Sequence, residues 1–249
     1  MEAGLLRGQK IDFLVRFDRV QQLSSLRFII PNFIWKTMRF LNIGHERVLR
    51  EDAVFLTDYV KNIINSRRAK GDFETADDLL AMYVRTGKST GKAYMLEEGY
   101  LVDAILNFMI AGRDTTSCTL TNMFKLLPTT PGVEQKMLDE LDRVVGRGHA
   151  VSWDHMRELR YCGAVFNEVL RMYPPVPGDG RTVVKDDILP SGIPVYSNQR
   201  VTMLNAAIGR DANLWENPDS FLPERWLQEG KPTRRPDEYV FPVFWGGPR

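Results

Sequence analysis

Hydrophobic and polar positions recur with a helical period over much of the first third of the chain. Between residues 46 and 68, apolar side chains return every three or four positions with charged side chains between them, which predicts an amphipathic helix. The apolar, aromatic stretch before it is broken at Pro31-Asn32 and again at Asn42-Ile43-Gly44. These breaks predict two shorter helices joined by an apolar loop.

The middle of the chain predicts one long helix. The polar segment 85–91 contains two glycines and predicts a loop, and the segment 96–127 after it has no proline and fits a helical pattern. Residues 101–111 are apolar on nearly all sides, which is typical of a helix that packs on every face. We therefore expect 96–127 to run through the interior of the fold.

The later part of the chain changes from helical to extended patterns. Residues 133–145 fit an amphipathic helix, and a further helix over 153–172 ends ahead of Pro174. Short β-type runs follow at 181–184, 194–196 and 201–204, separated by turn signals at Ser191-Gly192 and Ser197-Asn198. From Gly209 onward the chain predicts irregular backbone. The whole pattern indicates a mainly α protein with a small β-sheet.

Composition and charge narrow the class of protein. The chain has 249 residues, of which 43% are hydrophobic and 26% charged, as in ordinary globular domains. Because 33 Lys and Arg residues balance 32 Asp and Glu residues, the net charge of +1 provides no field for collecting nucleic acid. We expect no nucleic-acid partner.

Cysteines, histidines and apolar runs exclude further classes. The two cysteines, Cys118 and Cys162, cannot build a disulfide framework, and the three histidines lack the spacing of a zinc site. No residue of this chain is therefore predicted to bind a metal. No run of about 18 apolar residues occurs, so no membrane anchor is predicted within the chain, which leaves open an anchor in a longer parent protein.

Polar side chains interrupt the apolar part of the long predicted helix at Ala111-Gly112-Arg113-Asp114-Thr115-Thr116. An unsatisfied polar group in a buried helix costs about 1–3 kcal/mol, and Gly112 leaves bare backbone against which a flat ligand could lie. These features indicate a pocket. The alternative, in which the threonines bond to carbonyls one turn earlier and Asp114 reaches solvent, stays open on the local pattern alone.

A second polar pair lies on the helix predicted over 153–172. Glu168 and Arg171 stand one turn apart, a spacing that most often gives a solvated surface ion pair. Here the neighbours are Phe166, Val169 and Leu170, so the pair is hard to keep in water. A buried pair needs further hydrogen-bonding partners, and another arginine could supply them.

Together with two later motifs, these segments resemble the cytochrome P-450 family of haem-thiolate monooxygenases. AGRDTT at 111–116 is similar to the oxygen-binding helix motif of that family and EVLR at 168–171 to its ExxR helix. PERW at 223–226 is similar to the family's PERW or PERF element, and the final FWGGPR fits the start of the haem loop, so 220–249 would hold both. The resemblance implies a partial cytochrome P-450 fold over 1–249.

The resemblance implies a role for each matching residue. Asp114 and Thr115 would relay protons to oxygen bound at the haem, and Glu168, Arg171 and Arg225 would form a structural network that holds the haem-loop region. The residues implied to contact haem lie on the oxygen-binding helix, in the first predicted strand and in the haem loop: they are Ala111, Gly112, Arg181, Phe244, Gly247 and Arg249. Arg181 and Arg249 would face the propionates, since guanidinium groups match carboxylates.

The family pattern places its haem-ligating cysteine two positions beyond Arg249. On the resemblance we therefore expect a fragment in which the axial ligand, the early helices and an amino-terminal anchor are absent. A thiolate ligand favours O–O cleavage at the iron. Two readings stay open, a monooxygenase whose site is complete in a longer parent and a truncated, catalytically inactive family member.

The resemblance also implies cofactors, partners and a substrate class. These are haem b, O2, and electrons from NADPH delivered by a cytochrome P-450 reductase, with the parent at the endoplasmic reticulum membrane. The segments 35–36, 42–46 and 173–179 resemble the branch of the family that hydroxylates fatty acids near the methyl end. The implied substrate is an apolar small molecule, a fatty acid or a similar lipid.

Overall fold

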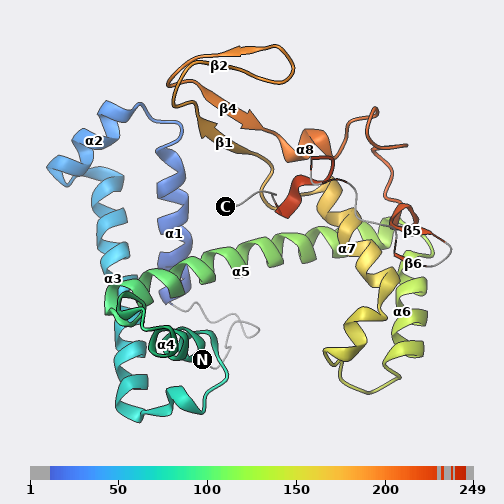
Figure 1. Ribbon diagram of the computed structural model, residues 1–249, viewed down its shortest axis with the longest axis horizontal. Helices are drawn as coiled ribbons and strands as arrows, with labels where there is room; N and C mark the ends of the chain where they lie inside the picture. The colour runs from blue at the N-terminus through green and yellow to red at the C-terminus, as the bar shows by residue number, and fades with distance from the viewer. Residues whose placement is uncertain (1–11, 229–230, 233–236, 238, 245–249) are drawn as a thin grey trace. The chain divides into compact units, whose positions relative to one another are not determined.

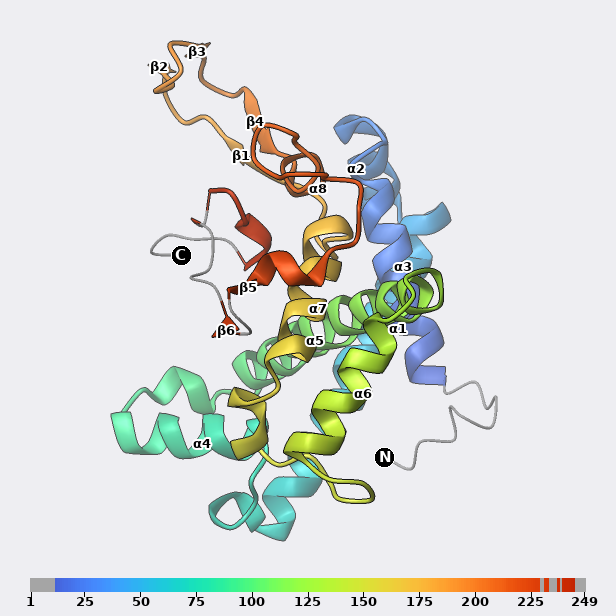
Figure 2. The same cartoon turned by 90° about the vertical axis from the view of Figure 1, so that its right-hand side faces the viewer.

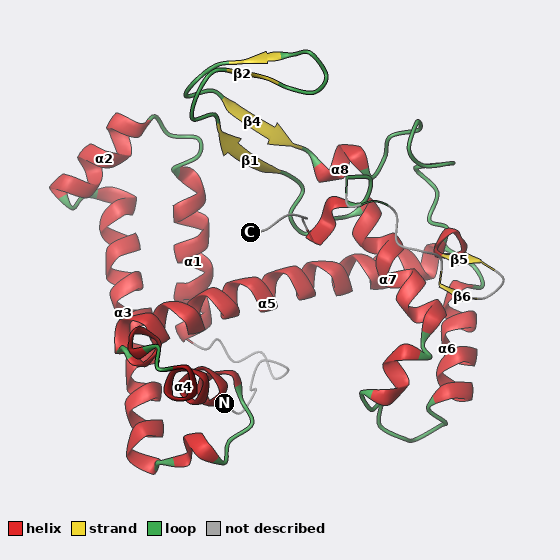
Figure 3. Ribbon diagram, viewed as in Figure 1, coloured by secondary structure: helices red, strands yellow, loops and turns green. Residues whose placement is uncertain are grey.

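The computed structural model describes residues 12–228, 231–232, 237 and 239–244. Two compact units divide the chain, residues 1–110 and 111–249, and each is described by itself. Helices dominate the described residues, and the strands are short and antiparallel (Figures 1 and 3), which confirms the predicted class of a mainly α protein with little β-structure. The β-structure consists of separate two-stranded ribbons rather than one sheet.

The first unit is built from helices. Its elements are α1 (Asp12–Leu26), α2 (Asn32–Leu41), α3 (Gly44–Lys70), α4 (Leu79–Thr90), the 3-10 turns η2 (Asp72–Glu74) and η3 (Ala93–Leu96), and the start of α5 (Glu98–Leu126). The helix α3 includes the amphipathic segment predicted over 46–68, and α1 and α2 precede it as the two shorter helices.

The core of the first unit lies between α1, α3 and α4. Phe13 and Phe17 of α1 pack with Leu56, Val60 and Ile64 of α3, and all five side chains are buried. Their four-residue spacing places them on one face of each helix, so burying that face removes a continuous apolar stripe from water.

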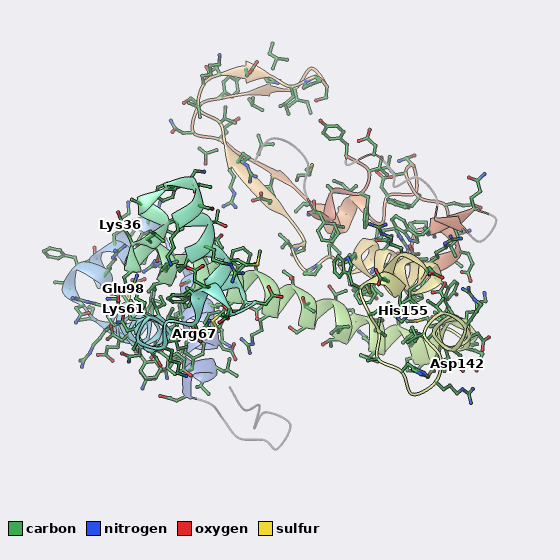
Figure 4. All side chains as sticks on the ribbon, turned by 60° about the horizontal axis from the view of Figure 1, so that its bottom comes forward. Lys36, Lys61, Arg67, Glu98, Asp142 and His155 are labelled. Atoms are coloured by element: carbon green, nitrogen blue, oxygen red, sulfur yellow. The ribbon has the colours of Figure 1, made fainter. Side chains whose placement is uncertain are left out.

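Polar bonds link the end of α3 to the start of α4. Arg67 of α3, labelled in Figure 4, contacts Asp72 at 2.7 Å and Asp78 at 2.9 Å. Asp78 also caps α4, because its carboxylate accepts a hydrogen bond of 3.0 Å from the Ala81 amide. These bonds fix the short connection between α3 and α4.

The prediction of a loop over 85–91 is wrong. These residues lie in the second half of α4, which continues to Thr90 and ends at Gly91 in a left-handed conformation. Gly87 is buried in the helix, and an added Cβ would lie 2.9 Å from the Leu96 side chain. The glycine permits close packing between α4 and η3, so a residue type that often marks a loop here marks a tight contact.

Burial of 101–111 on every face is also wrong. Leu101 and Val102 are buried, whereas Phe108 is 48% and Ile110 43% exposed. Leu101 and Val102 join the core cluster of the first unit, and Met123 joins a cluster near the other end of α5. The apolar residues between these two clusters have less of the described chain packed on them.

Among the described residues, the second unit holds the remaining helices and all the strands. Its elements are the rest of α5, α6 (Val133–Val144), α7 (Arg160–Met172), α8 (Asn205–Ile208), the 3-10 turns η4 (Leu127–Thr129), η5 (Asp154–Arg157), η6 (Pro223–Trp226) and η7 (Pro242–Phe244), and the strands β1 (Asp179–Thr182), β2 (Asp187–Ile188), β3 (Pro194–Val195), β4 (Arg200–Met203), β5 (Leu227–Gln228) and β6 (Lys231–Pro232). The helices α6 and α7 lie side by side in both views (Figures 1 and 2).

The helix predicted over 153–172 differs from the structure at its start. Residues 154–157 form the 3-10 turn η5, Leu159 leaves the helical conformation, and α7 begins at Arg160. The predicted turns are found, because Gly192 and Asn198 both have positive φ angles, 81° and 67°. They connect β2 to β3 and β3 to β4.

Candidate functional site

A buried ion pair occupies the carboxy-terminal half of α7. Glu168 is 0% and Arg171 1% exposed. Arg171 donates from Nε to Glu168 Oε2 at 2.9 Å and from Nη2 to Oε1 at 2.8 Å, a two-bond pairing of guanidinium and carboxylate. The pair predicted to be difficult to solvate is therefore fully enclosed.

The Glu168 carboxylate accepts further hydrogen bonds from the segment around η6. The Leu222 amide donates at 2.9 Å, Arg225 Nε at 3.1 Å and the Trp226 indole Nε1 at 2.9 Å. A buried charge is tolerated only when such donors replace its water. The structure thus brings Arg225 to the pair. The sequence indicated that another arginine could supply such a partner.

Arg171 uses its remaining donors on backbone carbonyls of the irregular segment after α8. Its Nη1 donates to Gly209 O at 2.5 Å and Pro218 O at 2.7 Å, and its Nη2 to Ser220 O at 3.1 Å. Position 209 requires glycine, because a Cβ there would lie 2.2 Å from the Arg171 carbonyl oxygen. One side chain therefore holds three points of a segment that has no regular hydrogen-bonding pattern of its own.

The 111–116 motif in α5 has a different environment. Thr115 Oγ1 donates to the Ala111 carbonyl at 2.6 Å, and the Asp114 carboxylate is 41% exposed and lies 3.5 Å from Arg113. The sequence left two interpretations open. This arrangement matches the one in which the threonine bonds to a carbonyl one turn earlier and the acid reaches solvent. Ala111 and Gly112 are exposed, and a Cβ added to Gly112 would meet no heavy atom within 4 Å.

The other predicted haem contacts lie in separate elements. Arg181 is in β1 and pairs with Asp179, whose pKa is held below its usual value chiefly by that guanidinium. Phe244 ends η7 and is 67% exposed. Gly247 and Arg249 fall outside the described residues.

The chain's two cysteines lie in different helices, Cys118 in α5 and Cys162 in α7. Burial, and then a hydrogen bond to Glu140, raise the pKa of the Cys162 thiol to about 12, which keeps it protonated. Cys118 is half-buried within α5. Within the described residues, no group of three or more His, Cys, Asp or Glu side chains could hold a metal ion.

Sequence reasoning missed a second polar cluster, between α6, α7 and η6. The buried Glu140 of α6 accepts hydrogen bonds from the amides of Tyr161 and Cys162, at 2.8 and 2.9 Å. The Tyr161 hydroxyl donates to Glu224 at 2.9 Å, and Lys136 contacts the same Glu224 oxygen at 2.6 Å. Glu224 belongs to the PERW motif, which was its only sequence signal.

In the part of the chain that the structure describes, no helix is both long and apolar enough to cross a membrane.

Comparisons with known proteins place these motifs in a family. The family model described as Cytochrome P450 matches residues 4–249. The chain is 33% identical to Cytochrome P450 94A1 of Vicia sativa over 248 residues, covering 95% of this chain and 46% of that protein. It is 36% identical to Cytochrome P450 94C1 of Arabidopsis thaliana over 244 residues, covering 96% of this chain and 48% of that protein.

The chain therefore spans about half the length of the curated relatives it matches. Its four motifs, the buried ExxR pair joined by Arg225 and the match of the family model along nearly the whole chain agree with one another. This chain belongs to the cytochrome P450 family.

Proposed function

We propose that the whole protein containing this chain is a haem monooxygenase that inserts one atom of O2 into a C–H bond of an apolar substrate. The observation that carries the proposal is the surface of α5 at 111–115, where exposed backbone at Ala111 and Gly112 adjoins a half-buried acid and a half-buried hydroxyl. The electrons would come from NADPH through a reductase.

The residues present suit a haem on that surface. Ala111 and Gly112 place no bulky side chain on it, and the space above Gly112 is open to a flat group. Arg181 offers a guanidinium that matches a propionate. When bound, the haem would supply oxygen activation.

Thr115 and Asp114 would move protons on that surface. The bond from Thr115 Oγ1 to the Ala111 carbonyl adds to the helix ladder, so turning the hydroxyl toward a ligand leaves the helix itself intact. Asp114 is one residue away and open to solvent, so its carboxylate can take protons from water and pass them toward the Thr115 hydroxyl.

A long-chain fatty acid is the substrate we propose, because the segments 42–46 and 173–179 resemble the fatty-acid-hydroxylating branch. The buried Glu168 network has a different role, since every polar atom of its carboxylate is already used by the protein. It would hold the fold and take no part in proton transfer.

The first test is the reduced, carbon monoxide difference spectrum of the whole protein, followed by turnover of a long-chain fatty acid with NADPH and a reductase. Thr115→Ala should lower hydroxylated product about 100-fold and divert consumed O2 to hydrogen peroxide. Thr116→Ala, the neighbouring exposed threonine, is the matched control and should keep both rates. A protein with no thiolate-type spectrum, or equal product from both variants, would contradict the proposal.

A further inference from the structure

The helix that carries Glu168 and Arg171 begins without a cap of its own. Leu159 precedes α7, and its side chain makes no capping hydrogen bond. The first amides of a helix have no partner within it, and a buried helix start needs acceptors from elsewhere. Here Glu140 of α6 supplies them, with Oε1 accepting from Tyr161 and Oε2 from Cys162.

The geometry of the Glu140 contact fixes the position of α7 on α6. Glu140 is 7% exposed, and its two oxygens engage two successive amides, so both the distance and the rotation of α7 relative to α6 are constrained. The carboxylate also lies at the positive end of the helix dipole. Arg143 approaches the same carboxylate at only 3.7 Å and is itself exposed, so the amides are the main partners.

A second link fixes η6 to the same helix pair. Tyr161, which gives its amide to Glu140, gives its hydroxyl to Glu224, and Lys136 reaches Glu224 from one turn before Glu140 on α6. The two residues after Glu224 are Arg225 and Trp226, both of which donate to Glu168. The helix α6 therefore contacts both α7 and η6, the two elements that meet at the buried Glu168 network.

The two fixed points on α7 lie far enough apart to define its axis. Tyr161 and Glu168 are seven positions apart, a rise of about 10 Å along the helix. Contacts at one end alone would leave α7 free to tilt. Contacts at both ends, each made with another element, prevent that tilt.

We propose that Glu140 is a positioning residue for the ExxR network: by capping α7 from α6, and with the Lys136–Glu224–Tyr161 contacts, it sets the register in which η6 meets Glu168. Its bearing on catalysis rests on the proposed function. The contacts themselves can be tested without haem or turnover.

Glu140→Gln is the test, in the full 249-residue chain carrying Cys118→Ser, with two reporters. One is the alkylation rate of Cys162, which should rise about tenfold for each unit by which its pKa falls when the carboxylate is removed. The other is the indole N–H resonance of Trp226 in a sample with 15N-labelled tryptophan, which should move because the bond to Glu168 changes. Glu134→Gln, an exposed glutamate of the same helix, should move neither reporter.

The Trp226 resonance separates positioning from simple stabilisation. If Glu140→Gln raises Cys162 alkylation but leaves that resonance unchanged in folded protein, Glu140 is a local cap and the proposal is overturned. Tyr161→Phe, which removes only the hydroxyl bonded to Glu224, should move the resonance in the same direction by less; no movement there also counts against the proposal. If Glu140→Gln moves the Trp226 resonance but the unsubstituted whole protein does not hydroxylate, the proposed function is overturned and the positioning role stands.

Discussion

The 111–116 segment of α5 and the Glu168–Arg171 pair of α7 place similar polar groups on helices but satisfy them in opposite ways. Thr115 bonds to a carbonyl one turn back, and Asp114 faces solvent. Glu168 and Arg171 are enclosed, and most of their partners lie 38 to 58 residues later in the chain. The first arrangement leaves groups available to a ligand, and the second commits them to the fold.

Removing the Glu168 charge should give the largest loss of stability. Glu168→Gln leaves the buried Arg171 guanidinium without its counterion, and breaking a buried pair in this way costs about 3–5 kcal/mol. Urea unfolding of the chain followed by circular dichroism would measure it. Asp114→Asn is the matched change on α5 and should stay within about 0.5 kcal/mol of the parent; equal losses would erase the contrast between the two regions.

Substituting Gly209 should give the next largest effect. In Gly209→Ala the new methyl group meets the Arg171 carbonyl oxygen, so the backbone must shift and the bond from Arg171 to Gly209 O must lengthen. We expect a loss of about 1–3 kcal/mol, measured by the same unfolding experiment. Gly99→Ala, where an added Cβ meets nothing, is the control and should not destabilise the chain.

Gly112→Ala should act in the other direction. Gly112 lies within α5 with open space beside it, so alanine should stabilise the chain by about 1 kcal/mol through helix propensity. In the whole protein the same methyl group would stand where the haem is proposed to lie, so haem retention should fall. A variant that gains stability and keeps its haem would show that this surface is not the haem-facing one.

The pH dependence of the Glu224 contact should give the smallest effect. Although burial opposes ionisation, the hydrogen bond from Lys136 is the largest of the interactions that bring the pKa of Glu224 below its usual value. Because the folded pKa is lowered, the contribution is present above the unfolded pKa, near 4.3, and is lost as pH falls through the folded value. The pair is half-exposed, so the contribution is about 0–1 kcal/mol.

Comparing the urea midpoint between pH 3 and 7 for the parent and Glu224→Gln would measure that contribution. The difference between the two proteins should be present at pH 7 and shrink toward pH 3. A difference that grows on acidification would mean that the carboxylate is not favoured in its charged form.

Local signals in the sequence were sufficient for part of this structure. Apolar periodicity located α3, and Gly192 and Ser197-Asn198 marked turns that the structure contains. The crowding of apolar residues around Glu168 and Arg171 correctly indicated a pair that cannot remain in water. Each of these inferences needed only residues within about one or two helical turns.

The failures share a physical cause, which is that distant partners decide the outcome. Gly87 stays helical because Leu96 packs against it, and Phe108 is exposed although most residues of the surrounding segment are apolar. Glu140 caps a helix that starts 20 residues later, and no feature of its own surroundings distinguishes it from a surface glutamate. Contacts of this kind are set by the fold and leave no local pattern.

The three carbonyl bonds of Arg171 bear on how the segment from Gly209 to Ser220 can evolve. Because the guanidinium recognises backbone oxygens, most side chains of this segment can be exchanged without touching those bonds. Adding or deleting a residue between them would instead move a carbonyl out of reach of a rigid, planar group. Apart from positions such as Gly209 and the buried Trp215, the segment should therefore tolerate substitutions but resist changes of length, whereas surface loops usually tolerate both.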